Sequence, residues 1–473
     1  MSRLVLGPFN RVEGDLELQL DVEGGQVSAA RVNSPLFRGF EQILVGRAPL
    51  DALAIVPRIC GICSVAQSAA AALALADAAG IVPAPNGRLA RHLIQATENL
   101  ADHLTHFYLF FMPDFARSEY ARHTWHGAVS ARFAALHGTA SGDMLPARAG
   151  FLRLMGFLAG RWPHTLALQP GGTTRAISSA ERIRVLAQIR DFRAFLEKTL
   201  FGDALEAVAA LGSIDALQAW AEARQGDFPA FLRAARTLRL EQTGRACDRF
   251  LSFGAYDLLP PGLLSAGMTS EPLDIGRISE DHRHAWLYGS DAVAPANGHT
   301  RVAADKADAY TWCKAPRYAG QVAETGALAR QLLAGHPLLQ AFVASHGGSV
   351  TARISARMIE LASLVPAMES WARQLSPGEA FCTQGEIPDE ADGVGLTEAA
   401  RGSLGHWLSV RHGRIARYQI IAPTTWNFSP RDAAGQPGPL EQALVGLPAG
   451  EGAPPLIQHV VRSFDPCMVC TVH

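Results

Sequence analysis

Long uninterrupted hydrophobic runs are missing from this chain of 473 residues. A helix that crosses a membrane needs about 20 consecutive apolar residues. The best candidate segment, residues 69–82, is interrupted by Asp77. The first residues, MSRLVLGPFN, contain no apolar core preceded by positive charge, so we expect no signal peptide. These absences predict a cytoplasmic chain without a membrane span.

The chain also lacks a marked excess of charge of either sign. Its formal net charge at pH 7 is −2. A protein that attracts nucleic acid or an anionic membrane surface carries a clear basic excess. We therefore expect no nucleic-acid partner, and we expect protein partners to be recognised by shape and apolar contact.

Cysteine is scarce and is not arranged as a disulfide framework. The chain has seven cysteines, and four of them form two CxxC pairs, one near each end of the chain. An odd number in a long chain favours metal ligation in a reducing compartment. The other three cysteines stand alone in the sequence, and we expect them to be small buried residues or unreactive thiols: Cys247, Cys313 and Cys382.

Two β-hairpins are predicted, one near each end of the chain. Apolar and polar residues alternate over 16–22 before the pair Gly24–Gly25, which predicts a hairpin over about 15–32. A second hairpin is predicted over Trp407–Ile421, around the turn His412–Gly413.

Helical patterns fill most of the chain between these hairpins. An alanine- and leucine-rich run over 68–79 ends at Gly80, and apolar residues recur every three or four positions over 88–111, 178–250 and 350–376. We therefore expect a mainly α protein with small peripheral β-sheets, an α+β class. We expect one domain over 1–473, with an N-terminal hairpin (about 1–32), a helical core (about 68–390) and a C-terminal hairpin with a metal motif (about 400–473).

The two CxxC motifs supply four thiols, from RICGIC (58–63) and DPCMVC (465–470). These motifs can meet only if the fold brings the two ends of the chain together. Four thiolates suit zinc, an iron–sulfur cluster or nickel, because soft ligands select soft or borderline metals. On spacing alone, a structural zinc site therefore stays open.

Eight motifs, in this order along the chain, resemble the large subunit of the nickel–iron hydrogenases. They are RVEGD (11–15), FRGFEQIL (37–44), RICGIC (58–63), HFY leading to Asp114, PHTLALQPGG (163–172), ARGSLGHW (400–407), APTTWN (422–427) and DPCMVCTVH (465–473). The resemblance implies a fold in which the N- and C-terminal segments meet at a buried metal site that cleaves dihydrogen heterolytically. Residues 175–390 carry no such motif.

The metal ligands follow from the resemblance. It implies that Cys60 and Cys467 are terminal thiolates on nickel. It also implies that Cys63 and Cys470 bridge nickel to an iron that carries carbon monoxide and cyanide. Heterolysis of dihydrogen needs a Lewis acid and a base, and a thiolate-bound pair of metals beside a carboxylate supplies both.

The same resemblance implies roles for an acidic and a basic residue near the metals. Glu13 would relay protons beside Cys467, although a surface glutamate on a strand is the alternative. Arg401 would lie over the open face of the metals, held in place by Asp114 and Asp465. Either aspartate could instead cap a helix.

Further contacts to the cofactor are expected from residues in two of the motifs. Pro423 and Thr424 resemble residues that face a cyanide, and Ala400 belongs to the same expected cofactor-binding set. A loop threonine satisfied by the backbone is the alternative for Thr424.

A second metal is also implied. Glu41 and His473 resemble the ligands of a buried magnesium-type cation, although such a hard ion normally prefers oxygen. A frayed chain end is the alternative for His473.

Three residues depart from the commonest pattern of the family. Most members carry histidine where this chain has Gln67, which keeps hydrogen bonding but loses a titratable group. The hydrogen-sensing branch shows this replacement and has bulky residues along the gas channel, matched here by Ile62 and Phe110. By contrast, the histidines at 103, 106 and 406 are expected to be ordinary core or surface residues.

The sequence thus predicts a hydrogenase, most like a hydrogen sensor of low turnover. We expect an iron–sulfur small subunit as partner, because no further cysteine cluster could hold an electron relay. We also expect signalling to a histidine kinase, with a dimer of heterodimers as an open possibility. The alternatives are a cytoplasmic uptake hydrogenase, a structural thiol–metal protein, and the related complex I subunit, which lacks the four cysteines. The chain ends at His473, either as a mature form or without a removable tail.

Overall fold

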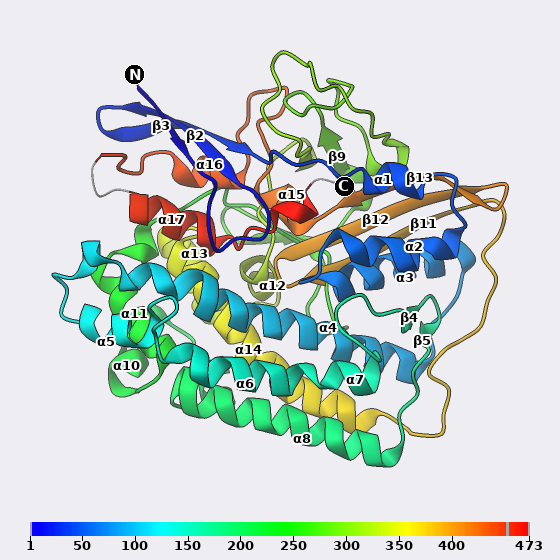
Figure 1. Ribbon diagram of the computed structural model, residues 1–473, viewed down its shortest axis with the longest axis horizontal. Coiled ribbons are helices and arrows are strands. Elements are labelled where there is room, and N and C mark those ends of the chain that lie inside the picture. The colour runs from blue at the N-terminus through cyan, green and yellow to red at the C-terminus, as the bar shows by residue number, and fades with distance from the viewer. Residues whose placement is uncertain (1, 451–453, 472–473) are drawn as a thin grey trace.

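The computed structural model describes residues 2–450 and 454–471. Figure 1 shows a layer of long helices in the lower half and small sheets above it. The helical layer contains α4 (Pro85–Thr105), α6 (Ala140–Leu152), α8 (Ser179–Phe195) and α14 (Val350–Gln374), and neighbouring helices pack against one another. The predicted combination of a helical core with small sheets is confirmed.

Two of these four long helices, α8 and α14, begin at side-chain caps that the sequence contains. Ser178 Oγ accepts from the N–H of Glu181 at the start of α8, and the Glu181 carboxylate accepts from the N–H of Ser178. Ser349 Oγ accepts from the N–H of Ala352 at the start of α14. Such caps satisfy amide groups that lack partners within the helix.

Apart from α3 (Ser64–Ala79), which packs against the C-terminal sheet, the remaining helices are shorter. Those of eight or more residues are α5 (His126–Phe133), α10 (Ile214–Ala223), α11 (Asp227–Thr237), α13 (Pro337–His346) and α17 (Pro454–Ser463). Shorter ones are α1 (Phe40–Leu44), α2 (Ala52–Ile55), α7 (Leu154–Leu158), α9 (Leu205–Ala209), α12 (Ala327–Leu333), α15 (Pro423–Asn427) and α16 (Pro439–Leu444). The 3-10 turns are η1 (Pro49–Asp51), η2 (Val56–Ile59), η4 (Met112–Ala116), η5 (Ser118–Tyr120), η7 (Leu240–Gln242), η8 (Ile275–Arg277), η9 (Pro295–Asn297) and η10 (Met468–Cys470).

The predicted helix over 88–111 changes its winding before its end. α4 stops at Thr105, and residues His106–Phe111 continue as a π-helix, η3. A second π-helical turn, η6 (Leu196–Phe201), follows α8. A π-turn alters the direction of every later side chain relative to a regular helix.

The described residues also form five small sheets. The N-terminal sheet contains β1 (Ser2–Leu6), β2 (Glu17–Glu23) and β3 (Gln26–Asn33). The predicted hairpin is therefore confirmed, with β1 as an additional strand. Short strands also form where we predicted helical core: β4 (Leu168–Gln169), β5 (Gly172–Thr173), β6 (Phe250–Ser252), β7 (Gly262–Ser265), β8 (Thr269–Glu271), β9 (Ile278–Asp281) and β10 (Ala315–Tyr318).

The C-terminal sheet lies against the helix that follows the first CxxC motif. Its strands are β11 (Ala391–Ala399), β12 (Gly402–Arg411) and β13 (Arg414–Ile421), so the predicted hairpin is confirmed and β11 is an unpredicted third strand. Helix α3 (Ser64–Ala79) packs on β11. A Cβ atom at Gly395 would lie only 1.9 Å from the carbonyl oxygen of Ala70, so glycine is required for this close approach.

Within the described residues, we find no helix with the length and apolar character that a membrane crossing requires.

Candidate metal centre

Four cysteine sulfurs from opposite ends of the chain meet in the interior. Cys60 follows η2, Cys63 is the N-cap of α3, and Cys467 and Cys470 flank η10. All four sulfurs lie within 4.8 Å of one another, and all four residues are buried. The Cys60 and Cys467 sulfurs are 3.4 Å apart, and the Cys63 and Cys470 sulfurs are 3.2 Å apart. The predicted meeting of the two motifs is confirmed.

Backbone pairing holds the C-terminal motif in place. Glu13 forms a parallel bridge with Cys467, and the N–H of Met468 donates to the Glu13 carbonyl at 2.7 Å. Figure 1 shows the N-terminal loop in blue beside the C-terminal segment in red. The position of the second CxxC motif is thus set by the first residues of the chain.

Arg38 joins the two motifs, and sequence reasoning gave it no role. Its guanidinium donates to the carbonyl of Ile59, just before Cys60, and to the carbonyl of Val469 at 2.6 Å, just before Cys470. The residue lies within the motif FRGFEQIL, so the motif was noticed but its arginine was not interpreted.

The thiols form one coupled set. The pKa of Cys60 lies well below its usual value because the thiols of Cys467, Cys470 and Cys63 donate to its sulfur. Cys63 stands at the N-terminus of α3, where the helix dipole also favours negative charge. The pKa values of Cys63, Cys467 and Cys470 are raised, so the cluster by itself favours one thiolate, at Cys60. A bound metal would favour the thiolate form of all four.

The partners of Arg401 differ from the prediction at one position. Its Nε donates to the Asp465 carbonyl at 3.0 Å, and its Nη2 lies 3.2 Å from carboxylate oxygens of both Asp465 and Asp102. Nη1 lies 2.9 Å from Asp102 Oδ2. Burial alone would raise the pKa of Asp465, but the charge of Arg401 lowers it below the usual value.

The predicted contact between Asp114 and Arg401 is wrong. Asp114 is buried in η4, and its carboxylate pairs with the guanidinium groups of Arg11, Arg117 and Arg462. The π-helical turn η3 separates Asp102 from Asp114, so the two carboxylates do not follow one regular helical phase. The sequence analysis did not assign a role to Asp102. A carboxylate on the buried face of a helix nevertheless indicates that a cationic side chain pairs with it in the interior.

Glu13 lies beside the thiols as expected. Its side chain is half-buried, and burial, together with the charge of Cys60, raises its pKa. A carboxyl group with a raised pKa can carry a proton at moderate pH.

Several buried donors around the thiols have unused hydrogen-bonding capacity. Thr424 Oγ accepts from the N–H of Cys467 at 3.2 Å, which leaves its own hydrogen free to donate. Thr425 Oγ1 and Gln67 Nε2 make no hydrogen bond to the described residues. Arg401 Nη1 pairs with Asp102 and has a second N–H that can donate. Buried donors normally have acceptors, so this lining fits a metal group with diatomic ligands that accept hydrogen bonds. Pro423 begins α15 immediately before Thr424.

Gln67 belongs to a buried hydrogen-bonded chain. Its Oε1 lies 2.8 Å from His406 Nε2, and His406 Nδ1 lies 2.8 Å from the hydroxyl of Tyr418. The predicted ordinary histidines are all buried: His103 contacts Glu360, and His106 contacts the carbonyl of Arg462. Burial lowers the pKa of His106 to about 3, so it is neutral.

The expected magnesium ligand Glu41 pairs with a lysine. Lys314 Nζ lies 3.1 Å from Glu41 and 3.3 Å from Glu280, and Thr300 Oγ also donates to Glu41. The two carboxylates are the oxygen ligands that a hard cation prefers. Lys314 already supplies positive charge between them, so the described side chains do not require a second cation. His473 lies outside the described residues.

The two expected channel residues lie in different environments. Ile62 is half-buried and packs against the apolar cluster that contains the four thiols. Phe110 is half-buried in η3, and its carbonyl accepts from Arg11 at 3.3 Å. Their channel role stays a prediction.

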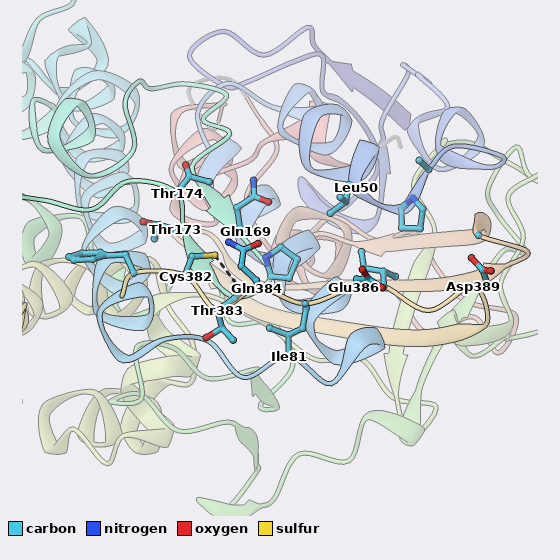
Figure 2. A pocket seen from close by; sticks show the side chains of 18 of the residues that line it. Leu50, Ile81, Gln169, Thr173, Thr174, Cys382, Thr383, Gln384, Glu386 and Asp389 are labelled. Atoms are coloured by element: carbon cyan, nitrogen blue, oxygen red, sulfur yellow. Dashed lines mark hydrogen bonds between the residues drawn. The ribbon is translucent and has the colours of Figure 1, made fainter. Parts of the chain in front are cut away.

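The three single cysteines are not part of the four-sulfur cluster, although Cys313 Sγ contacts the carbonyl of Thr425 at 3.9 Å. Burial raises the pKa of Cys247 to about 12 and raises the pKa of Cys313. Cys382 lines a surface cavity of about 830 Å³, shown in Figure 2 with Gln169 and Gln384. None of the four clustered cysteines lines this cavity.

Comparison with known proteins decides between a zinc site and a nickel site. The family model described as nickel-dependent hydrogenase matches residues 38–124 and 143–473. The chain belongs to the nickel-dependent hydrogenase family. It is therefore an oxidoreductase that acts on hydrogen, and the zinc alternative is removed.

Curated relatives span the whole chain. The chain is 30% identical to the large subunit of the periplasmic [NiFeSe] hydrogenase of Desulfomicrobium baculatum, with 100% of this chain and 95% of the relative covered. It is 28% identical to the uptake hydrogenase large subunit of Azotobacter chroococcum, with 100% and 95% covered.

A solved structure shares the fold. The reduced, active Ni-Fe-Se hydrogenase of Desulfomicrobium baculatum superposes with a TM-score of 0.86 at 29% identity, with both chains covered completely. The match includes the metal site formed by N- and C-terminal cysteines.

Proposed function

We propose that this chain, with an iron–sulfur small subunit, cleaves dihydrogen heterolytically at a nickel–iron centre. One observation carries the proposal: four buried sulfurs from the two ends of the chain converge within 4.8 Å of one another. The charge of Arg401 interacts with Cys467 and Cys63, and the backbone of Glu13 pairs with Cys467. Cys60, Cys63, Cys467 and Cys470 would hold the metals. When bound, the group would supply the Lewis acid that polarises dihydrogen.

The residues of the chain would supply the rest of the chemistry. Glu13 would accept the proton, because its carboxyl group is half-buried and its backbone pairs with Cys467. Arg401 would present Nη1, and Thr424 and Thr425 their hydroxyl groups, to acceptor ligands such as carbon monoxide and cyanide on iron. Ala400 and Pro423 precede two of these donors in sequence.

A divalent cation such as magnesium at Glu41 and His473 is part of the proposal. It would share the Glu41 carboxylate with Lys314, which lies 3.1 Å away. Metal analysis of the purified complex tests this point. A complex that contains nickel and iron but no stoichiometric magnesium or similar cation would contradict this part of the proposal.

The small subunit is proposed from the need for electron transfer. Apart from the four clustered thiols, each described cysteine stands alone, so the described chain offers no ligand set for an iron–sulfur relay. The curated relatives are named as large subunits or large chains. Co-purification of a second chain that contains iron–sulfur clusters is the expected result.

The biological role is proposed to be hydrogen sensing in the cytoplasm, with a histidine kinase as the downstream partner. Gln67 favours this role, because it places a non-titrating amide one helical turn beyond Cys63, hydrogen-bonded to His406. The second candidate is an uptake hydrogenase, which the name of the Azotobacter relative favours.

Turnover separates the two roles. The complex with its small subunit is assayed for hydrogen-dependent dye reduction before and after exposure to air. Slow turnover that survives air supports a sensor. Rapid turnover that air abolishes supports uptake instead, and no hydrogen-dependent reduction at all in a nickel-loaded complex contradicts the whole proposal. Size-exclusion chromatography tests whether two heterodimers associate.

A further inference from the structure

Arg330 on α12 is an arginine without solvent contact that lies outside the proposed metal site. Its exposed fraction is 0%, and it comes from the part of the chain that carries no motif. A buried guanidinium is stable only when its five N–H groups find acceptors. All five of them do so here.

Two of these acceptors belong to the turn that carries Arg401. Nη1 of Arg330 donates to the carbonyl of Ala399 at 2.9 Å, and Nη2 donates to the carbonyl of Ala400 at 3.1 Å. These residues link β11 to β12, directly before Arg401. Arg330 therefore fixes the two peptide groups that precede the Cα atom of Arg401.

The remaining acceptors are buried carboxylates. Glu360 on α14 receives Nε and Nη2 at 3.0 and 2.8 Å, and Glu398 at the end of β11 receives Nη1 at 2.8 Å. Burial alone would raise the pKa of Glu360, but the charge of Arg330 and contact with His103 lower it to about 2. The Glu360 carboxylate is therefore ionised, and its two oxygens hold Nε and Nη2 of the Arg330 guanidinium in place.

Glu360 connects this arrangement to the second support of Arg401. Its Oε1 lies 3.2 Å from His103 Nε2. The neighbouring residue on α4 is Asp102, whose carboxylate lies 2.9 Å from Arg401. One contact path thus runs from the turn of Arg401 through Arg330, Glu360 and α4 back to the guanidinium of Arg401.

The turn is also held close to α12 by glycine. A Cβ atom at Gly402 would lie 2.4 Å from Thr325 Oγ1, two residues before the start of α12. The turn and the beginning of the helix therefore approach more closely than any residue with a side chain would permit.

We propose that Arg330 is a positioning residue that sets the location of the Arg401 guanidinium above the metal centre, an inference that rests on the proposed function. Lysine cannot replace it, because an ammonium group has three donors and lacks the planar fork that contacts two carboxylates and two carbonyls together. Arg330 contacts no residue of the cysteine motifs in the hydrogen bonds described, so it acts through Arg401.

The test compares Arg330→Lys with a matched control, Arg317→Lys. Arg317 is also buried, pairs with Asp432 at 2.7 Å, and donates to the carbonyls of Pro430 and Gln436 at 3.1 and 3.0 Å. It touches neither Arg401 nor its turn. Glu360→Gln is measured alongside. It removes the charge that pairs with Arg330, with almost no change in side-chain volume.

Four quantities are measured on the complex with its small subunit: nickel content, thermal midpoint, infrared bands of the diatomic ligands and hydrogen-oxidation rate. Arg330→Lys and Glu360→Gln should keep nickel, shift the cyanide bands, and lower the rate roughly 10- to 100-fold, the loss expected when a positioned group is displaced. Amide hydrogen exchange at 399–402 should rise. Arg317→Lys should leave the bands, the exchange at this turn and the rate unchanged.

Two results would overturn the proposal. One is unchanged bands and rate in Glu360→Gln together with unchanged exchange at 399–402. The other is equal losses in the Arg330 and Arg317 variants that track only their thermal midpoints. If wild-type protein binds nickel but shows no diatomic bands, the proposed function fails. Amide hydrogen exchange at 399–402 still tests whether the hydrogen bonds from Arg330 hold the turn in place.

Discussion

The guanidinium of Arg401 lies 2.9 Å from the carboxylate of Asp102, whereas Asp114 forms ion pairs with three other arginines. Two buried aspartates close in sequence thus have different tasks. One holds a cationic group beside the thiols, and the other joins the N-terminal loop to α17 through Arg11 and Arg462.

Substitution of the two aspartates should separate these tasks. Asp102→Asn should lower the hydrogen-oxidation rate at least about tenfold, because Arg401 loses one ion-pair partner. Asp114→Asn should instead lower the free energy of unfolding by about 3–5 kcal/mol, the usual effect of breaking a buried ion pair. Rates per nickel and urea unfolding distinguish the two. A slower Asp114→Asn enzyme beside an unaffected Asp102→Asn enzyme would restore the original assignment.

Removal of one clustered thiol should abolish metal binding. Cys63→Ser should leave the complex with little nickel and no activity, because three thiolates no longer complete the soft ligand set. Cys247→Ser is the matched control, since Cys247 lies outside the cluster. Nickel and iron are counted by elemental analysis. Full nickel content in Cys63→Ser would contradict the ligand assignment.

Glu13→Gln should block proton transfer while keeping the metals. The hydrogen-oxidation rate should fall roughly 100- to 10,000-fold, the range typical of a lost general base. Nickel content and infrared bands should remain. Glu17→Gln on β2 is the control, because Asn33 is the one side chain of the described residues that donates a hydrogen bond to the Glu17 carboxylate. An active Glu13→Gln enzyme would remove the carboxylate from the proton path.

Smaller side chains at the expected channel positions should admit oxygen. The double variant Ile62→Val, Phe110→Leu should lose activity during air exposure that the wild type survives, because a wider route admits the larger gas. Activity is followed against time under air. Equal survival of the two proteins would separate these residues from oxygen tolerance.

The stability of the chain should depend on pH through Glu441. Its buried carboxyl group accepts from Val32 N–H at 3.0 Å and from the Tyr310 hydroxyl at 2.7 Å. Burial raises its pKa to about 7, so the folded chain binds the proton more tightly than the unfolded chain. The contribution is complete below the unfolded pKa and is lost as pH rises toward 7.

Glu441→Gln isolates this effect, because glutamine keeps the acceptor oxygen and cannot ionise. The free energy of unfolding of the wild type should fall relative to the variant as pH rises from 4.5 to 7.5, by an amount on the order of 3 kcal/mol. Urea unfolding at several pH values measures the difference. A difference that is constant with pH would contradict a raised pKa for the buried Glu441 carboxyl group.

The sequence predicted the parts of the fold that local patterns specify. Gly24–Gly25 marked the N-terminal hairpin, Gly80 marked the end of α3, and the two CxxC motifs marked the metal site. Each depends on residue types at short spacing. β11 was missed because its glycines, required where α3 packs, weaken the usual strand pattern.

The supports of the site could not be predicted in the same way. Arg330 pairs with Glu360 and Glu398, thirty and sixty-eight residues away along the chain, in a stretch without motifs. Asp102 and Asp114 both lie near the HFY motif, and a π-helical turn lies between them, so their spacing in sequence does not tell which one reaches Arg401. Such contacts depend on how helices are placed, and side-chain spacing alone does not determine that placement.

Infrared spectroscopy of the purified complex, with nickel counted on the same sample, tests the central claim most directly. The account predicts about one nickel per chain and stretching bands of carbon monoxide and cyanide that respond to hydrogen. Zinc in place of nickel, with no bands in the region of the diatomic ligands, would contradict it.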